Sequence, residues 1–264
     1  MASAAVQIIT LTTDFGLQDY YLAAMKGVIL GIAPAACLVD VTHEVPAQDV
    51  RRAAFVLRHA ACWFPAGTVH LAVVDPGVGT ARLGLAVRAQ GQLWVGPDNG
   101  LFTFLWRAPD LEVRAISPGE LTAPPPSATF HGRDLFAPAA AHLASGVALG
   151  RLGPPVARPQ TLPQLDPLRA AGRTEGQVVH VDRFGNLVTN IGIADLPGPP
   201  ERVRVRPGGG REVRGLARTY GDAPAGELLA LIGSAGLLEI SVGGGSAAAL
   251  LGAGPGQPVV VEVP

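Results

Sequence analysis

Apolar runs of strand length alternate with helix-length segments in the first half of this 264-residue chain. The pattern predicts strands at 6–14, 37–42, 68–75, 83–89 and 93–96, and helices at 19–33, at 48–62 and from Gly132. Strands that alternate with helices in this way favour an α/β layered domain whose sheet is mostly parallel.

The pattern changes near residue 151, where a Pro-rich stretch with neither helical nor strand periodicity follows. Beyond it, short β-type runs separated by Gly-containing turns predict strands at 176–182, 187–191, 202–206, 211–216, 227–232, 236–242 and 258–263. Runs of this kind favour a small barrel or sandwich. We therefore predict an N-terminal α/β domain over 1–155, a linker over 156–172 and a smaller, β-barrel-like C-terminal domain over 173–264.

The composition argues against a nucleic-acid-binding protein and against a membrane protein. Hydrophobic residues make up 48% of the chain and charged residues 16%, with a formal net charge of −1, so nothing in the charge balance supports nucleic-acid binding. The long uncharged tract near the C-terminus is interrupted by Gly and Pro, which argues against a membrane span. Cys37 and Cys62 are expected to be buried free thiols. With no signal-like N-terminus, we expect a cytoplasmic protein.

Acidic residues follow two of the predicted parallel strands. Asp14 and Asp75 each end a strand, at the edge of an α/β sheet where ligands bind. The Pro-Gly-Val-Gly turn after Asp75 lets the backbone approach a ligand closely, and Arg82 can fold back to the acid, which would keep it ionised. Asp14 and Asp19 can equally cap the following helix. The pair of Asp75 with Arg82 can likewise be a structural ion pair that closes a turn.

His131 precedes the last predicted helix of the first domain, and a neutral His can accept or relay a proton near pH 7. A His at a helix entrance can also be purely structural. Arg133 and Asp134 are expected to brace the domain through a salt bridge. The remaining histidines show no metal-ligand spacing, so we expect no metal site.

The second half carries polar residues in turns. Asp182 and Asn186 flank a Phe-Gly turn, and an Asn amide can both donate and accept at the edge of a purine. Asn after Gly is also ordinary hairpin chemistry. Tyr220 can stack on a base or simply pack in its loop, and Ser234 lies in a Gly-rich loop whose amides can cradle a ligand.

Seven segments occur in order and resemble one family, and the resemblance runs from about residue 7 to residue 262. They are LTTDFGLQDYYLAAMKG, DVTHEVPAQDVRRAA, VVDPGVGTAR, VGPDNGLF, TFHGRDLFAPAAAHLA, VDRFGNLVTNI and GSAGLLEISVGGGSAA. Together they are similar to the S-adenosyl-L-methionine (SAM) hydroxide adenosyltransferases, hydrolytic relatives of the fluorinases and chlorinases. The resemblance implies cleavage of SAM by water at C5′ to adenosine and methionine, without a cofactor. It also implies a homotrimer that binds SAM between subunits.

The resemblance also implies roles for individual residues. The water-activating triad would be Asp75, Arg82 and His131, with the identity of the base left open. The substrate contacts would be Asp14 to the ribose, Asp19, Asp182 and Ser234 to the methionine part, Asn186 to adenine, and Phe130 and Tyr220 to the nucleoside.

Two alternatives stay open at this stage. A SAM-dependent halogenase is disfavoured because the halogenating relatives have a Tyr in place of Asp75 and a halide-binding Ser in place of Gly132. A non-catalytic sensor that binds SAM or adenosine is disfavoured by the intact set of Asp75, Arg82 and His131.

Overall fold

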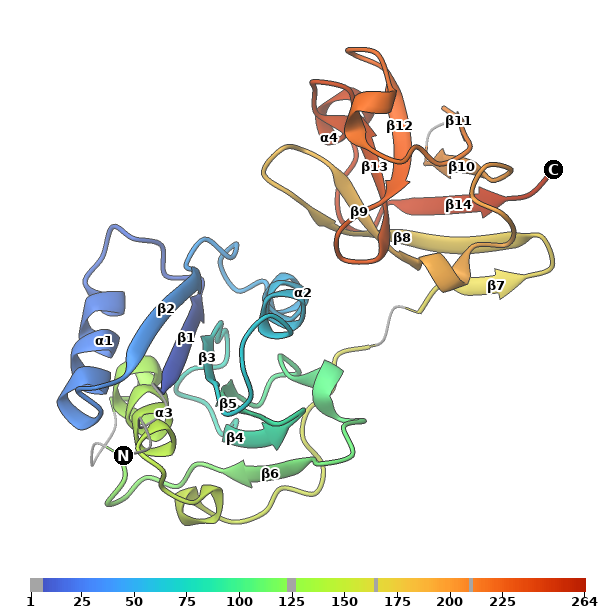
Figure 1. Ribbon diagram of the computed structural model, residues 1–264. Helices are drawn as coiled ribbons and strands as arrows, with labels where there is room; N and C mark the ends of the chain where they lie inside the picture. Colours follow the sequence, from blue (N-terminus) through green and yellow to red (C-terminus); the bar gives the residue numbers. More distant parts are fainter. Residues whose placement is uncertain (1–6, 123–126, 164–165, 209–210) are drawn as a thin grey trace, which may run out of the picture. The chain divides into compact units, whose positions relative to one another are not determined.

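The computed structural model divides the chain into two compact units, Met1–Leu162 and Pro163–Pro264 (Figure 1). It describes residues 7–122, 127–163, 166–208 and 211–264. Residue 6 of the first predicted strand and residues 164 and 165 of the predicted linker lie outside the described residues.

A six-stranded sheet forms the centre of the first unit, in the order β2-β1-β3-β5-β4-β6. The first four strands of this order pair in parallel, whereas β4 pairs antiparallel with β5 and β6. The strands are β1 (Ile8–Thr13), β2 (Cys37–Thr42), β3 (Val69–Val73), β4 (Gly84–Ala89), β5 (Gln92–Pro97) and β6 (Glu112–Ala115). The predicted mostly parallel α/β sheet is confirmed, with β6 as an unpredicted edge strand.

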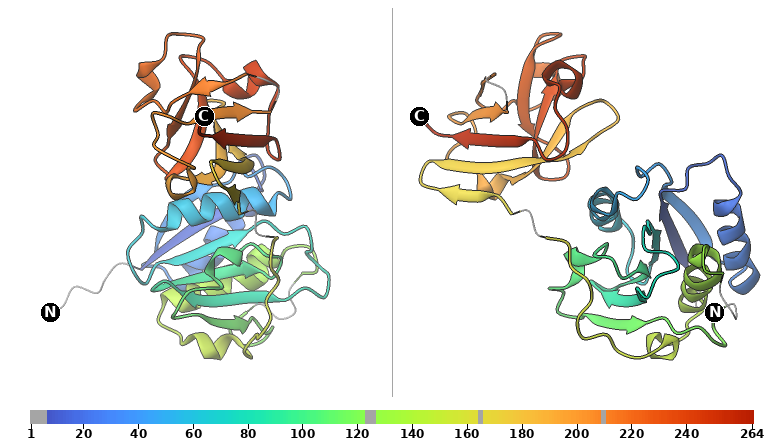
Figure 2. Two further views of the ribbon diagram at one scale, coloured as in Figure 1. Left: turned by 90° about the vertical axis from the view of Figure 1, so that its right-hand side faces the viewer. Right: turned by 180° about the vertical axis from the view of Figure 1, so that it is seen from behind.

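Helices cover both faces of this sheet (Figures 1 and 2). α1 (Tyr21–Ile32) and α3 (Ala137–Ala144) pack on one face, where Met25 and Ile29 are fully buried. α2 (Val50–Ala61) packs on the other face through Ala53 and Leu57, spaced four residues apart on one side of the helix. Short helical turns lie at Thr103–Leu105 and Leu149–Leu152. None of the described helices is long and apolar enough to cross a membrane.

The two cysteines differ from expectation. Cys37 and Cys62 are free but exposed, so the prediction of buried thiols is wrong. Cys37 opens β2, which is an edge strand, and Cys62 is the residue that ends α2. Both positions lie at the margins of their elements, and the apolar sequence neighbours of the two cysteines carried no information about that.

The second unit is an antiparallel, nearly closed barrel in the strand order β11-β10-β14-β8-β9-β13-β12, with β7 paired to β8. Its strands are β7 (Leu168–Ala170), β8 (Arg173–Val181), β9 (Leu187–Gly192), β10 (Arg204–Pro207), β11 (Val213–Arg214), β12 (Leu228–Ile232), β13 (Leu237–Val242) and β14 (Pro258–Glu262). The helical segments are Ile193–Asp195, Tyr220–Asp222 and α4 (Ala247–Leu251). The predicted barrel-like fold is confirmed, whereas β7 and α4 were not predicted.

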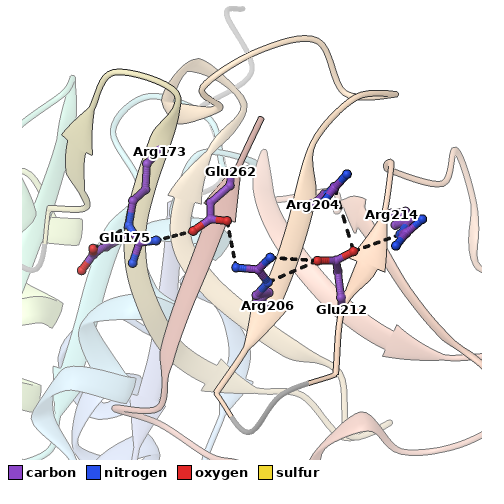
Figure 3. A network of polar contacts seen from close by, with 7 residues as sticks. All are labelled: Arg173, Glu175, Arg204, Arg206, Glu212, Arg214 and Glu262. Atoms are coloured by element: carbon purple, nitrogen blue, oxygen red, sulfur yellow. Dashed lines mark hydrogen bonds and ion pairs between the residues drawn. The ribbon is translucent and has the colours of Figure 1, made fainter. Parts of the chain in front are cut away.

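Arginines and glutamates alternate across the outer face of β8, β14, β10 and β11 (Figure 3). Glu262 accepts from Arg173 and, at 2.9 Å, from Arg206, which also bonds Glu212 at 3.0 Å. Exposed ion pairs of this kind contribute little each. The stability of the barrel therefore rests mainly on its buried aliphatic core, which includes Val178 and Ile240.

Candidate active site

Asp75 follows β3 and opens the turn that returns Arg82 to the end of that strand. Nε of Arg82 donates to Oδ1 of Asp75 at 2.9 Å, and Nη2 pairs with Oδ2. The two side chains are only 5% and 9% exposed. Gly77 permits this return, because a Cβ there would lie 3.3 Å from Cγ of Arg82. The predicted pair therefore forms as a buried fork that also closes the turn.

The same guanidinium contacts His131. Nη2 of Arg82 lies 2.7 Å from Nδ1 of His131. Because an arginine can only donate, Nδ1 must accept, and the neutral imidazole carries its proton on Nε2. Burial lowers the pKa of His131, and the charge of Arg82 lowers it further, against the opposing carboxylates of Asp75 and Asp134. Arg82 thus bridges a carboxylate and a neutral imidazole.

His131 stands at the start of a π-helical turn, Gly132–Phe136, that continues into α3. π-turns of this kind occur often at functional sites. The turn places the Phe136 ring under the guanidinium of Arg82, whose Cζ lies 5.1 Å from the ring centroid. The cation–π contact adds a further restraint on Arg82.

Arg133 and Asp134 brace this turn, as the sequence predicts. Nε of Arg133 lies 2.5 Å from Oδ1 of Asp134, and Nη2 donates to Oδ2 at 2.8 Å. The hydrogen bonds from Arg133 lower the pKa of Asp134, although burial opposes them. The same carboxylate accepts the amide of Ser127 at 2.8 Å, so it ties the preceding loop to the turn that carries His131.

Asp14 lies on a cavity of about 380 Å³ that belongs wholly to the first unit. The cavity is lined by Asp14, Phe15, Gly16, Leu17, Gln18, Asp19, His43, Glu44, Val45, Pro46 and Ala47. Oδ2 of Asp14 accepts the amide of Gln48 at 2.8 Å, while Oδ1 has no hydrogen bond from the described residues. Gln48 has φ of 65°, a left-handed conformation that is uncommon outside glycine. The amide of Gln48 therefore holds the carboxylate of Asp14 in place, and Oδ1 remains available to a ligand.

Neither acidic residue of this loop caps α1. The N-cap position is Tyr20, and it makes no side-chain capping bond. Asp19 is exposed and lines the cavity instead. The capping alternative for Asp14 and Asp19 is wrong because the helix begins at Tyr21, later than the sequence pattern indicated.

An aromatic cluster connects the cavity with the Asp75–Arg82–His131 group. Phe15 lines the cavity, and its ring centroid lies 6.2 Å from that of Phe130, the residue before His131. Tyr21 packs edge-on against Phe130 at 5.1 Å. A Cβ on Gly132 would lie 3.5 Å from the Phe15 ring, so the two segments are in direct contact. The two groups form one continuous region.

In the second unit, Asp182 and Asn186 hold one turn together. Oδ1 of Asp182 accepts the amides of Phe184 and Asn186 at 2.9 and 2.8 Å, and Oδ2 accepts Nδ2 of Asn186 at 2.8 Å. The side-chain nitrogen of Asn186 thus stabilises the hairpin turn, as the structural alternative for this residue predicted. The side-chain oxygen of Asn186 has no hydrogen bond from the described residues.

Tyr220 is fixed by a residue that sequence analysis missed. Its hydroxyl donates to Oε2 of Glu239 at 2.7 Å, and Glu239 is 7% exposed. Burial, together with the hydrogen bond to Glu239 and the charges of Glu239 and Asp182, raises the pKa of Tyr220 to about 12. Tyr220, Glu239 and Asp182 therefore lie near one another. Ser234 is exposed in the turn between β12 and β13.

His43 was also missed, and it lines the same cavity as Asp14. A lone histidine without metal spacing gave no signal, because its hydrogen-bond partner Thr13 lies on β1, 30 residues away. Among the described residues, no group of three or more His, Cys, Asp or Glu side chains is arranged to hold a metal ion.

Both units match domain models of one protein family. Residues 9–153 match the SAM hydroxide adenosyltransferase N-terminal domain, and residues 176–260 match the C-terminal domain of the same name.

Two relatives that share one name align with nearly the whole chain. A protein of Thermus thermophilus named (R)-S-adenosyl-L-methionine hydrolase is 47% identical over 94% of this chain and 96% of its own length. One of the same name from Salinispora arenicola is 45% identical, with 98% of each chain covered. A fluorinase of an Actinoplanes species is more distant, at 30% identity over 72% of this chain and 73% of its own length.

A solved structure supports the fold. The crystal structure of an uncharacterised conserved protein from Thermotoga maritima is 39% identical to this chain. It superposes with a TM-score of 0.90 and covers 96% of this chain and 99% of that one. The likeness therefore extends through both units in sequence and in structure.

Proposed function

Because the chain belongs to the SAM hydroxide adenosyltransferase family, we propose that it hydrolyses SAM to adenosine and L-methionine. The water oxygen bonds to C5′ as the C5′–S bond breaks, and the electron pair of that bond leaves with sulfur as the neutral thioether of methionine. One proton is released. The observation that carries the proposal is the buried Arg82 fork that joins Asp75 to a neutral His131.

The main task of the enzyme in this reaction is to position the attacking water. A sulfonium is already a good leaving group, so the enzyme must hold a weakly nucleophilic water in line with the C5′–S bond. Precise positioning can lower a barrier by up to about 7–11 kcal/mol. A rigid, buried set of polar groups suits this demand because it needs no reorganisation during the reaction.

We assign proton acceptance to Asp75. The Nδ1 lone pair of His131 is occupied by the hydrogen bond from Arg82, so this imidazole has no free site for a proton. Each oxygen of Asp75 accepts one bond from Arg82 and retains further acceptor capacity. His131 instead offers its Nε2–H to orient the water. Arg82 holds both groups in place.

Substrate contacts follow the same assignment. The available oxygen of Asp14 suits one hydroxyl of the ribose diol, and the exposed Asp19 suits the cationic amine of methionine. The side-chain oxygen of Asn186 suits the exocyclic amine of adenine. We also assign Phe130 and Tyr220 to the nucleoside, and Asp182 and Ser234 to the methionine part.

The proposal also covers the cofactor requirement, the oligomeric state and the cellular compartment. SAM is the substrate, so no cofactor is invoked. Likeness to the family supports a homotrimer that binds SAM between subunits, which light scattering would test through the molecular mass. The free thiols Cys37 and Cys62 suit a reducing cytoplasm.

Product analysis tests the function directly. SAM is incubated with the pure protein, with and without fluoride or chloride, and the nucleosides are separated by chromatography. Adenosine and methionine in equal amounts under every condition support hydrolysis. A 5′-halo-5′-deoxyadenosine as the main product would identify a halogenase. Tight SAM binding without any product would identify a sensor.

A further inference from the structure

His43 is a buried polar residue with no place in the proposed chemistry. It is 4% exposed, follows β2 and lines the cavity beside Asp14. Its Nδ1 lies 2.9 Å from Oγ1 of Thr13, the fully buried last residue of β1. On the other side of the ring, Nε2 lies 3.1 Å from Oδ1 of Asp40.

These contacts continue to the surface. Nζ of Lys26 on α1 donates to Oδ2 of Asp40 at 2.7 Å. Burial raises the pKa of Asp40, but its contacts with Lys26 and His43 outweigh that and lower it overall. The ionised Asp40 favours the tautomer of His43 that carries its proton on Nε2. The contact is electrostatic, because Nε2 does not meet the geometry of a hydrogen bond.

That tautomer leaves Nδ1 as an acceptor, so the hydroxyl of Thr13 must donate to it. The Thr13 oxygen then accepts the amide of Phe15 at 3.3 Å. The carbonyl of His43 accepts the amide of Gly16 at 2.8 Å. The backbone on both sides of Asp14 is therefore tied to one histidine.

We propose that His43 and Thr13 are positioning residues that aim the carboxylate of Asp14 at the substrate ribose. Their hydrogen bonds fix the 13–16 segment, so Asp14 keeps its orientation without contacting either residue directly. This inference rests on the proposed function, in which Asp14 holds the ribose.

A second threonine–histidine pair on the same strand provides a matched control. Oγ1 of Thr10 lies 2.8 Å from Nδ1 of His70, and both residues are fully buried. Neither Thr10 nor His70 lines the cavity. Thr10→Val and Thr13→Val therefore each remove a buried threonine–histidine bond, one away from the cavity and one beside it, and Thr13→Val also removes the acceptor of the Phe15 amide.

The test measures the KM and kcat for SAM and the Kd for adenosine in the full-length protein. Thr13→Val should raise KM and Kd about tenfold, as expected for losing one or two hydrogen bonds, with kcat less affected. Thr13→Ser keeps the hydroxyl and should restore KM. Thr10→Val should lower the melting temperature and leave KM unchanged.

An unchanged KM in Thr13→Val, with a melting temperature lowered as in Thr10→Val, would overturn the inference. Should Thr13→Val fail to fold, Asp40→Asn decides, because Asp40 is partly exposed. It should raise KM severalfold, and an unchanged KM would overturn the inference. Failure of the wild type to cleave SAM would instead refute the proposed function.

Discussion

Asp75→Asn separates the proposed catalytic role of the carboxylate from its structural role. The substitution is nearly isosteric, but an amide can accept from only one arm of the Arg82 fork and presents N–H groups to the other. Turnover should fall about 10²–10⁴-fold, the usual contribution of a positioned proton acceptor. That loss corresponds to about 3–5 kcal/mol of barrier, at about 1.4 kcal/mol per tenfold.

The same substitution should destabilise the first unit. Asp75 and Arg82 are 5% and 9% exposed, so the variant leaves a guanidinium buried without its counter-charge. Breaking a buried pair typically costs about 3–5 kcal/mol. The retained contacts of Arg82 with His131 and Phe136 place the expected cost near the lower figure.

The double variant Asp75→Asn/Arg82→Met tells the two effects apart. Removing the unpaired guanidinium should recover part of the melting temperature without recovering adenosine formation. Asp110→Asn serves as the control, because Asp110 accepts the amides of Gln90 and Gly91 at 2.8 Å in an exposed turn and should be dispensable for turnover. Asp75→Asn turnover within threefold of wild type would refute the assignment of Asp75 as the proton acceptor.

Three further predictions concern other residues. His131→Ala removes the donor that orients the water and should reduce adenosine formation about 100-fold or more, with the Kd for adenosine within threefold of wild type by calorimetry. His70 is fully buried, and burial lowers its pKa to about 4, so the unfolded state gains its proton first as the pH falls. Urea unfolding should lose about 3 kcal/mol between pH 6.5 and 4, a loss that His70→Gln removes. Tyr220→Phe leaves Glu239 without its donor and should cost about 1–3 kcal/mol of unfolding free energy in urea.

Local sequence patterns were sufficient for features that depend on neighbouring residues. The parallel strands follow from alternating apolar runs, and their carboxyl ends place Asp14 and Asp75 at one edge of the sheet. The return of Arg82 to Asp75 is a short-range event within a Pro-Gly turn. The structure adds the reason that the turn is this tight, because Gly77 leaves room for the arginine stem.

Features that depend on residues far apart in the chain could not be predicted from the sequence. Glu239 is buried in a mostly apolar strand, and its carboxylate accepts from the hydroxyl of Tyr220, which lies on a separate helical turn. His43 is bonded to Thr13, 30 residues away on β1, as well as lying beside its near neighbour Asp40. Buried polar groups are specified by pairs of residues, so a pattern along one segment cannot reveal them.

Hydrolysis of SAM in heavy-oxygen water (H₂¹⁸O) tests the central claim most directly. Adenosine should acquire one ¹⁸O at its 5′ position and methionine should acquire none, as read by mass spectrometry of the two products. Unlabelled adenosine would show that solvent water does not attack C5′. Label in methionine, or cleavage at another carbon–sulfur bond, would equally contradict an Asp75–Arg82–His131 site that directs water to C5′.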